Sequence, residues 1–217
     1  FEDSSNIDCK FERVKTRIYL NSIKKNIWPN ISNDLNCFSS LNSNLLKKTD
    51  YVFKTWAKNN IIVDKSGAVR VDYGSLKIVF EKSQLFAVRL VGKIIQSVGG
   101  KEYPPKRKKT YDLIFSLFIN KLKKKSLGNV NVFSCNDYLF FIRENRNLSF
   151  EVSIKENEYY VFDGRFLLKS SLPGKLCKCS DSDLIAIDDK NPFNKYRHWI
   201  NNTIPVSYTH LRAHETI

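Results

Sequence analysis

The 217-residue sequence contains no methionine and only three histidines, six prolines and eight glycines. No apolar run approaches the ~20 residues that a membrane-spanning helix needs. The sequence also lacks any glycine-rich loop of the kind that cradles phosphates at the start of a helix. These absences argue against a transmembrane segment and against a nucleotide-binding domain of the usual loop type within the chain.

Both ends of the sequence are unusual. The lack of methionine, together with Phe1 at the start, predicts a piece of a longer reading frame. Residues 205–217 resemble a translation of sequencing-adaptor DNA, so we treat them as an artefactual tail and exclude them from fold reasoning. An ordinary polar tail is the alternative. His210 and His214 lie in this tail and His198 has no second ligand nearby, so we predict no metal site.

The cysteines are five in number and scattered along the chain. Cys177 and Cys179 are separated by one residue, whereas zinc knuckles usually have two to four residues between their cysteines. The pattern therefore predicts reduced thiols and a cytoplasmic location. The remaining cysteines are Cys9, Cys37 and Cys135.

The charge balance is strongly basic, with 36 Lys and Arg residues against 22 Asp and Glu residues and a net charge of +14. Such an excess favours a polyanionic partner such as a nucleic acid. The alternative is compositional drift, because lysine greatly outnumbers arginine and AT-rich genomes favour lysine, asparagine and isoleucine codons.

Apolar residues in the first part of the chain recur with the spacing of an α-helix. We predict a polar loop over residues 1–9, then a helix from about residue 10 to 27 with Asp8 as its N-cap. A second helix is predicted from about residue 33 to 59. Its expected buried stripe consists of Leu35, Phe38, Leu41, Leu45, Val52 and Trp56.

Further along the chain, the spacing of apolar residues and the turn residues predict strands as well as helices. Residues 61–64 and 68–72 are predicted to form two strands joined by a turn at Gly67, and residues 83–98 a helix that ends at Gly99-Gly100. Pro104-Pro105 is expected in the first turn of the next helix. From residue 126 a period of two predicts successive strands, with turns at Asn136-Asp137 and Asp163-Gly164. Residues 183–199 are interpreted as a loop with a short helix.

Several motifs are spaced over most of residues 1–170. The first is an acidic-Ser-Asn-x-Asp loop followed by a helix that opens with arginines, and a Val-Gly-Gly-x-x-Tyr-Pro-Pro stretch and an aromatic-Asp-Gly-Arg-Phe motif come later. The segments are Glu2 to Arg17, Val98 to Pro105, Leu127-Gly128, Arg143-Glu144 and Phe162 to Phe166. In their order and spacing they resemble tRNA(Ile)-lysidine synthetases, notably those of alphaproteobacteria. Val14 departs from the pattern, because many members have Asn there.

The resemblance implies an α+β chain in three parts. Residues 1–32 would end a catalytic N-terminal domain, residues 33–147 would form a tRNA-binding middle domain with a small antiparallel sheet, and residues 148–204 would form part of a β-rich domain. The intact enzyme would use ATP to adenylate the wobble cytidine in the CAU anticodon of an isoleucine tRNA, and free lysine would then displace AMP. The Ser-Gly-Gly-x-Asp-Ser motif of the family is absent. We therefore expect ATP and Mg²⁺ to bind to a domain outside this chain, and catalytic residues to lie outside it too.

Substrate-binding residues are predicted at the N-terminus. Arg13 and Arg17 lie four apart on one helix face, where two guanidiniums are suited to phosphate oxygens. Pairing with Glu2, Asp3 or Glu12 is the alternative. Asn6 and Asp8 belong to the same predicted site, although loop shaping and helix capping are competing roles for them.

A second basic region is predicted to bind the tRNA body. Positive charge at the start of a helix opposes the helix dipole, so stability alone does not favour a basic cluster there. A phosphate partner accounts for it, and a solvated lysine face is the alternative. The predicted tRNA-binding residues are Arg89, Lys93, Lys101, Lys106, Arg107, Lys108 and Lys109, and further lysines follow at residues 121–125.

Two other classes of function stay open. One is a stand-alone basic nucleic-acid-binding module without catalytic activity, and the other is a structural or interaction protein whose charge reflects codon usage. A homodimer is also open.

Overall fold

The computed structural model describes residues 8–121, 123–146, 148, 151–178, 193, 196, 200, 203 and 205–209. Its helices and antiparallel sheets confirm the predicted α+β class. The chain divides into two compact units, Phe1–Trp56 and Ala57–Ile217. The three-part division that the resemblance implies stays a prediction.

The first unit contains helix α1 (Glu12–Asn26) and most of helix α2 (Ile31–Asn60). The prediction that Asp8 caps α1 is wrong, because the N-cap is Phe11, whose side chain makes no capping hydrogen bond. Asp8 Oδ1 instead accepts a hydrogen bond from the Lys10 backbone N–H at 2.9 Å. This is a local turn of the kind that aspartate forms readily outside helices.

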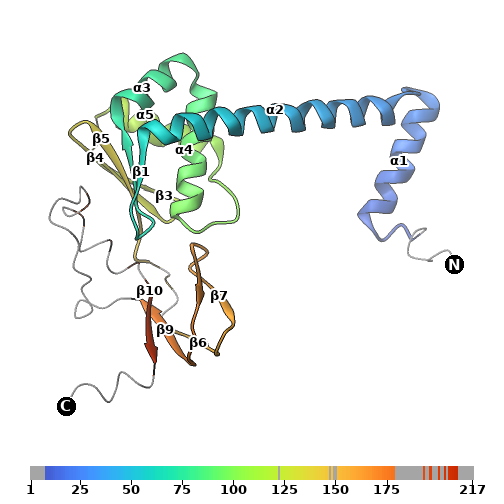
Figure 1. Ribbon diagram of the computed structural model, residues 1–217. Coiled ribbons are helices and arrows are strands. Elements are labelled where there is room, and N and C mark those ends of the chain that lie inside the picture. Colours follow the sequence, from blue (N-terminus) through green and yellow to red (C-terminus); the bar gives the residue numbers. More distant parts are fainter. Residues whose placement is uncertain are drawn as a thin grey trace, which may run out of the picture. The chain divides into compact units, whose positions relative to one another are not determined.

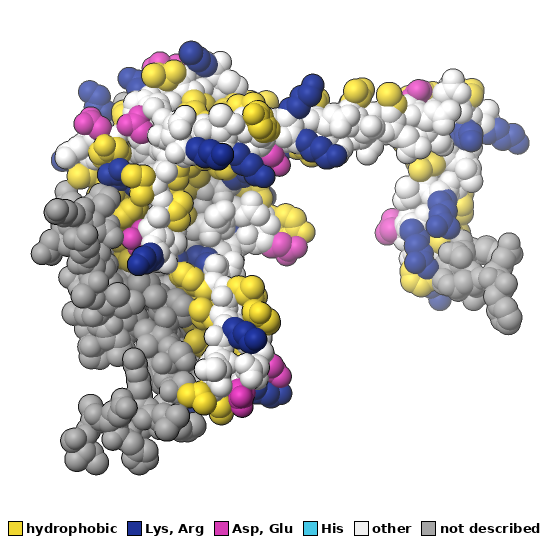
Figure 2. Space-filling view, viewed as in Figure 1, with side chains coloured by type: hydrophobic (Ala, Val, Ile, Leu, Met, Phe, Trp, Pro, Cys, Tyr) yellow, Lys and Arg dark blue, Asp and Glu magenta, His cyan; other side chains and the backbone are white. Residues whose placement is uncertain are grey.

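The apolar stripe of α2 was predicted to be buried, and this is wrong for most of its length. The exposed fractions of Phe38, Leu45 and Val52 are 65%, 61% and 51%, and only Trp56 of the stripe is half-buried. Figure 2 shows the apolar side chains at the surface of this helix. The helical period was correct, but a period shows only which residues share a face, and not whether another element covers that face.

The second unit is organised around a five-stranded antiparallel sheet in the order β1-β2-β5-β4-β3 (Figure 1). The predicted turns are present, because Gly67 and Asn136 both have positive φ, at 76° and 51°. The strands are β1 (Ile61–Val63), β2 (Val69–Asp72), β3 (Lys124–Leu127), β4 (Val130–Cys135) and β5 (Tyr138–Arg143).

Three helices pack with this sheet: α3 (Tyr73–Lys82), α4 (Gln84–Val98) and α5 (Arg107–Phe118). The Asp72 carboxylate caps α3 by accepting from Ser75 N–H at 2.7 Å, and Ser83 caps α4. Helix α3 was not predicted from the sequence. Pro105 was predicted in the first turn of α5, whereas the N-cap is Lys106 and the proline precedes the helix.

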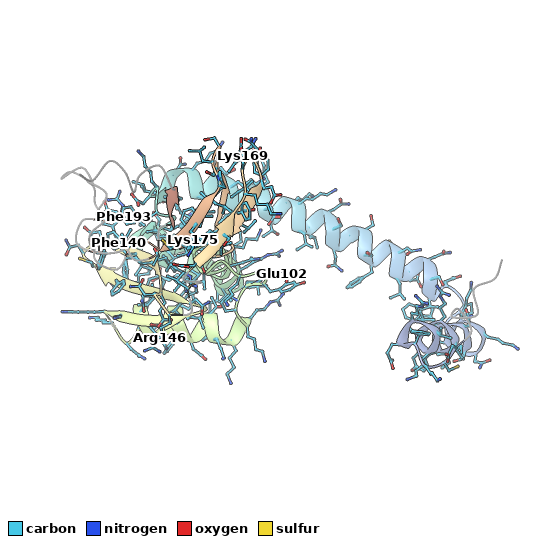
Figure 3. All side chains as sticks on the ribbon, turned by 90° about the horizontal axis from the view of Figure 1, so that it is seen from below. Glu102, Phe140, Arg146, Lys169, Lys175 and Phe193 are labelled. Atoms are coloured by element: carbon cyan, nitrogen blue, oxygen red, sulfur yellow. The ribbon has the colours of Figure 1, made fainter. Side chains whose placement is uncertain are left out.

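Alternating side chains of β5 build two cores, one on each face of the sheet. Leu139 and Phe141 are fully buried on the face that α4 covers. On the other face, Phe140 and Ile142 pack with residues from the C-terminal part of the chain. The Phe140 and Phe193 rings meet edge to face with centroids 5.6 Å apart (Figure 3). Phe193 therefore belongs to the second core, although most of the predicted 183–199 segment lies outside the described residues.

A smaller β region follows the main sheet. Strands β6 (Glu151–Ile154), β9 (Gly174–Lys178) and β10 (Pro205–Thr209) form an antiparallel sheet in the order β10-β9-β6. Strands β7 (Tyr159–Phe162) and β8 (Phe166–Lys169) form a hairpin around the predicted Asp163-Gly164 turn. Strand β10 lies within the segment that resembles adaptor sequence, and the origin of that segment stays a prediction.

Candidate nucleic-acid interface

The Val-Gly-Gly motif ends α4 at a point where three backbone segments approach one another. Gly100 has a φ of 61°, which favours glycine, and a Cβ atom there would collide with the Asp163 carbonyl oxygen. A Cβ atom on Gly99 would collide with the carbonyl oxygen of Gly128. Glycine is therefore required at both positions by close backbone contact with the β3–β4 turn and with the β7–β8 turn.

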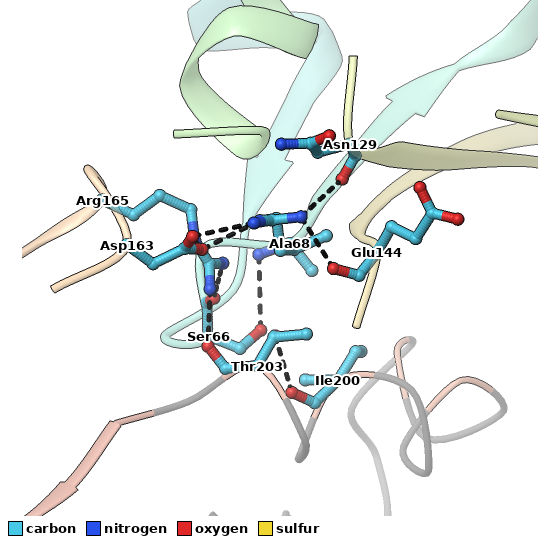
Figure 4. A network of polar contacts seen from close by, with 9 residues as sticks. Ser66, Ala68, Asn129, Glu144, Asp163, Arg165, Ile200 and Thr203 are labelled. Atoms are coloured by element: carbon cyan, nitrogen blue, oxygen red, sulfur yellow. Dashed lines mark hydrogen bonds and ion pairs between the residues drawn. The ribbon is translucent and has the colours of Figure 1, made fainter. Parts of the chain in front are cut away.

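The Asp-Gly-Arg motif of the β7–β8 turn is the centre of a buried ion network (Figure 4). Arg143 Nε and Nη2 donate to the two oxygens of Asp163 at 2.8 Å each, and Arg165 Nε donates to Asp163 Oδ2 at 2.8 Å. The side chains of Arg143, Asp163 and Arg165 are 2%, 9% and 4% exposed.

Backbone carbonyls accept further hydrogen bonds from both guanidiniums of this network. Arg143 Nη1 donates to Glu144 O at 2.7 Å and to Asn129 O at 3.3 Å. Arg165 donates to Ser66 O and Thr203 O. Burial lowers the pKa of Arg165, Asp163 opposes this shift, and the charge of Arg143 adds to it. Both arginines are buried, and every nitrogen of their guanidiniums donates at least one hydrogen bond within the protein. The network therefore joins β5 to the β7–β8 hairpin and serves a structural role.

Beside this junction lies an open pocket of about 280 Å³. Lys101, Lys106 and Lys109 line it, so three of the predicted tRNA-binding residues meet at one place. Its other lining residues are Ile95, Gln96, Tyr103, Pro105, Leu127 and Gly128.

The surroundings of the pocket are strongly basic. Arg107 and Lys108 occupy the first turn of α5 and are exposed, and that turn contains no acidic residue. Glu102, labelled in Figure 3, is exposed on the loop of residues 99–106 that joins α4 to α5. In the described part of the chain, none of the five cations from Lys101 to Lys109 forms an ion pair. The electrostatic conditions for an anion-binding surface are therefore present.

Other predicted tRNA-binding residues lie away from the pocket lining. Arg89 and Lys93 are half-buried on α4. Of the later lysines, Lys125 donates from Nζ to Ser116 Oγ at 2.7 Å, and Lys124 Nζ lies 5.2 Å from the Phe133 ring centroid. The last two therefore have structural contacts within the protein.

The predicted N-terminal site belongs to the first unit. Arg13 and Arg17 are exposed on α1, and the Arg13 guanidinium lies 5.0 Å from the Phe11 ring centroid. Glu12, a predicted alternative partner of the arginines, pairs with Lys15 at 2.7 Å. Asn6, Glu2 and Asp3 lie outside the described residues. The structure therefore brings the two arginines to one exposed helix face, as their spacing predicts.

Sequence reasoning missed the uncharged part of the pocket. Tyr103 is 73% exposed among the lysines, and the apolar wall comes from segments about thirty residues apart. The available signal was the Tyr-Pro-Pro sequence inside the basic cluster, because aromatic residues among cations are typical of single-strand binders.

No family model, no curated protein and no solved structure matches this chain. Among the described residues, no three His, Cys, Asp or Glu side chains are grouped so that they would hold a metal ion. Four of the five cysteines are described, and none of these four forms a disulfide bond within the described residues. None of the described helices combines the length and apolar character required to cross a bilayer.

Proposed function

We propose that this chain binds tRNA, and that it is part of a ligase resembling the tRNA(Ile)-lysidine synthetases. The observation that carries the proposal is the convergence of Lys101, Lys106 and Lys109 on one pocket, with Arg107 and Lys108 beside it. The sequence motifs that resemble the family supply the identity of the nucleic acid.

The proposed role of the basic residues is to hold phosphates. Lysine ammonium groups act as point charges that tolerate many phosphate positions, whereas arginine favours paired contacts. Such contacts fix the position of the RNA without reading its sequence. Selection of one tRNA over another must therefore come from shape or from base contacts.

The proposed ligase activity needs groups that the described residues do not supply. They contain neither a glycine-rich phosphate loop nor a metal-ligating cluster. We therefore assign ATP, Mg²⁺ and the chemical step to another part of the ligase. The exposed pair Arg13 and Arg17 is the proposed contact of this chain with substrate phosphates.

The test is binding of the full 217-residue chain to an isoleucine tRNA with a CAU anticodon and to elongator methionine tRNA, at two salt concentrations. A variant with Lys101→Ala, Lys106→Ala and Lys109→Ala is compared with Lys47→Ala/Lys48→Ala, whose lysines are exposed on α2. We expect steep salt dependence, and a shallower slope only in the pocket variant.

The outcomes separate the candidate functions. Preference for the isoleucine tRNA supports the ligase proposal. Equal, salt-dependent binding of both tRNAs supports a stand-alone nucleic-acid-binding module. Absence of binding to either tRNA contradicts both, and leaves a basic surface that reflects composition alone.

A further inference from the structure

The pocket beside α5 has two chemically different parts. Ile95, Pro105 and Leu127 contribute an apolar wall, while Lys101, Lys106 and Lys109 contribute positive charge. A phosphate alone would use only the lysines. A ligand that uses both parts needs a flat or apolar group attached to an anion.

Tyr103 supplies an aromatic surface at the same place. It is 73% exposed and lines the pocket, so its ring is accessible to a ligand. Proteins that bind single-stranded nucleic acid combine a basic groove with aromatic side chains on which bases stack. The pocket therefore has the composition of a nucleotide site, whereas a purely basic surface would suit the outside of a duplex.

The size of the pocket limits what it accommodates. Its volume of about 280 Å³ lies just below the usual range for small-molecule sites, which is about 300–1,000 Å³. It has room for one nucleotide-sized group and none for a base-paired helix, so a nucleic acid would enter it as an unpaired nucleotide.

The loop that carries Lys101 and Tyr103 is held in place by hydrogen bonds within the protein. Gln96 Nε2 donates to Glu102 O at 2.6 Å, and Lys101 N–H donates to Gln96 O at 3.1 Å. Gly100 of the same loop contacts the backbone of the β7–β8 turn. The ion pair between Arg143 and Asp163 fixes that turn. Because this loop is ordered in advance, a flexible RNA strand loses less entropy when it binds there.

We infer that this pocket binds one unpaired nucleotide of an RNA strand, with the base against Tyr103 and the apolar wall and the phosphates held by Lys101, Lys106 and Lys109. This inference rests on the proposed RNA binding and adds to it a preference for single-stranded or looped RNA at this position.

The test compares a short single-stranded RNA with a blunt duplex of the same length, using the full chain and fluorescence anisotropy. Tyr103→Ala should weaken single-strand binding by about 5- to 150-fold, the range expected for the loss of one stacked base. Duplex binding should stay within twofold. Tyr103→Phe should restore single-strand binding, because the ring alone stacks.

Tyr51→Ala is the matched control, because Tyr51 on α2 is also 73% exposed. Equal effects of Tyr103→Ala and Tyr51→Ala on single-strand binding would overturn the inference. If salt-dependent RNA binding persists in that case, the proposed function stands and only the nucleotide pocket fails. If the unmodified chain binds neither RNA, the proposed function itself fails.

Discussion

Arg143 and Asp163 form a two-pronged ion pair in which both hydrogen bonds measure 2.8 Å and both side chains are almost fully buried. The pair fixes the β7–β8 turn against β5, and the backbone of that turn contacts Gly100 at the base of the pocket loop. A structural ion pair and the proposed binding loop are therefore linked through the backbone contacts of Gly100 with Asp163 and Gly164.

The first prediction concerns the charge balance of this network. Asp163→Asn should lower the free energy of unfolding by about 3–5 kcal/mol, because it leaves two buried arginines without a counter-charge. Urea unfolding followed by circular dichroism measures the change. Glu151→Gln is the control: its carboxylate pairs with Lys175 at 3.2 Å where both side chains are 62% exposed, so the loss should be about 1 kcal/mol or less. Equal losses in the two variants would refute the structural role of Asp163.

The second prediction concerns Gly100. Gly100→Ala should destabilise the protein by more than about 1 kcal/mol, because its Cβ atom would meet the Asp163 backbone and its φ is positive. Gly74→Ala is the matched control. Gly74 lies in the first turn of α3 with a negative φ and ordinary contacts for a Cβ atom, so alanine should raise stability by about 0.4–1 kcal/mol. Thermal unfolding of the two variants should shift in opposite directions, and shifts of the same sign would contradict the prediction.

Local sequence signals predicted several element boundaries and turns in the second unit. Ser83 and Gly99 delimit α4 because capping is decided by short-range hydrogen bonds and backbone conformation. The turns at Gly67 and Asn136 were predictable for the same reason. Helix α3 was missed although Asp72 caps it, since Tyr73-Gly74 at its start resembles a turn.

Long-range features were beyond sequence reasoning. The exposed stripe on α2 has the same period as a buried one, and the pocket wall depends on Leu127 and Ile95 meeting in space. The Val-Gly-Gly and Asp-Gly-Arg motifs were recognisable as separate strings, but their contact through Gly100 and Asp163 was not. The sequence predicted a basic cluster from Lys101 to Lys109 near one helix start. It did not predict that Lys101, Lys106 and Lys109 share a pocket.

The third prediction concerns Tyr196. Burial, together with the neighbouring Cys135 thiol, raises the pKa of Tyr196 from its ordinary value of 10.0 to about 12. Between these two values the unfolded chain has lost the phenol proton and the folded chain has kept it. Stability should therefore fall as the pH rises from about 10 towards 12, by at most ~1.4 kcal/mol per pH unit. Comparing urea unfolding of the unmodified chain and Tyr196→Phe at pH 9 and pH 11 isolates this loss, which the variant should lack. An equal pH dependence in both proteins would exclude Tyr196 as its source.

The fourth prediction sets stability against binding at the start of α5. Lys108 lies in the first turn, where its charge opposes the helix dipole. Lys108→Glu should therefore raise the free energy of unfolding by about 0.3–1 kcal/mol at low salt. The same change should weaken tRNA binding and lower the salt slope by about one, as expected for loss of one phosphate contact.

Lys82→Glu is the control for this trade-off, because Lys82 lies in the last turn of α3, where positive charge is favourable. It should lower stability by a similar amount and leave tRNA affinity unchanged. Binding titrations and urea unfolding on the same preparations measure both quantities. A Lys108→Glu variant that is more stable and still binds tRNA with full affinity would mean that the basic first turn of α5 does not contact phosphate. Opposite changes in stability and affinity would instead explain why the sequence keeps a lysine where the helix alone favours an acid.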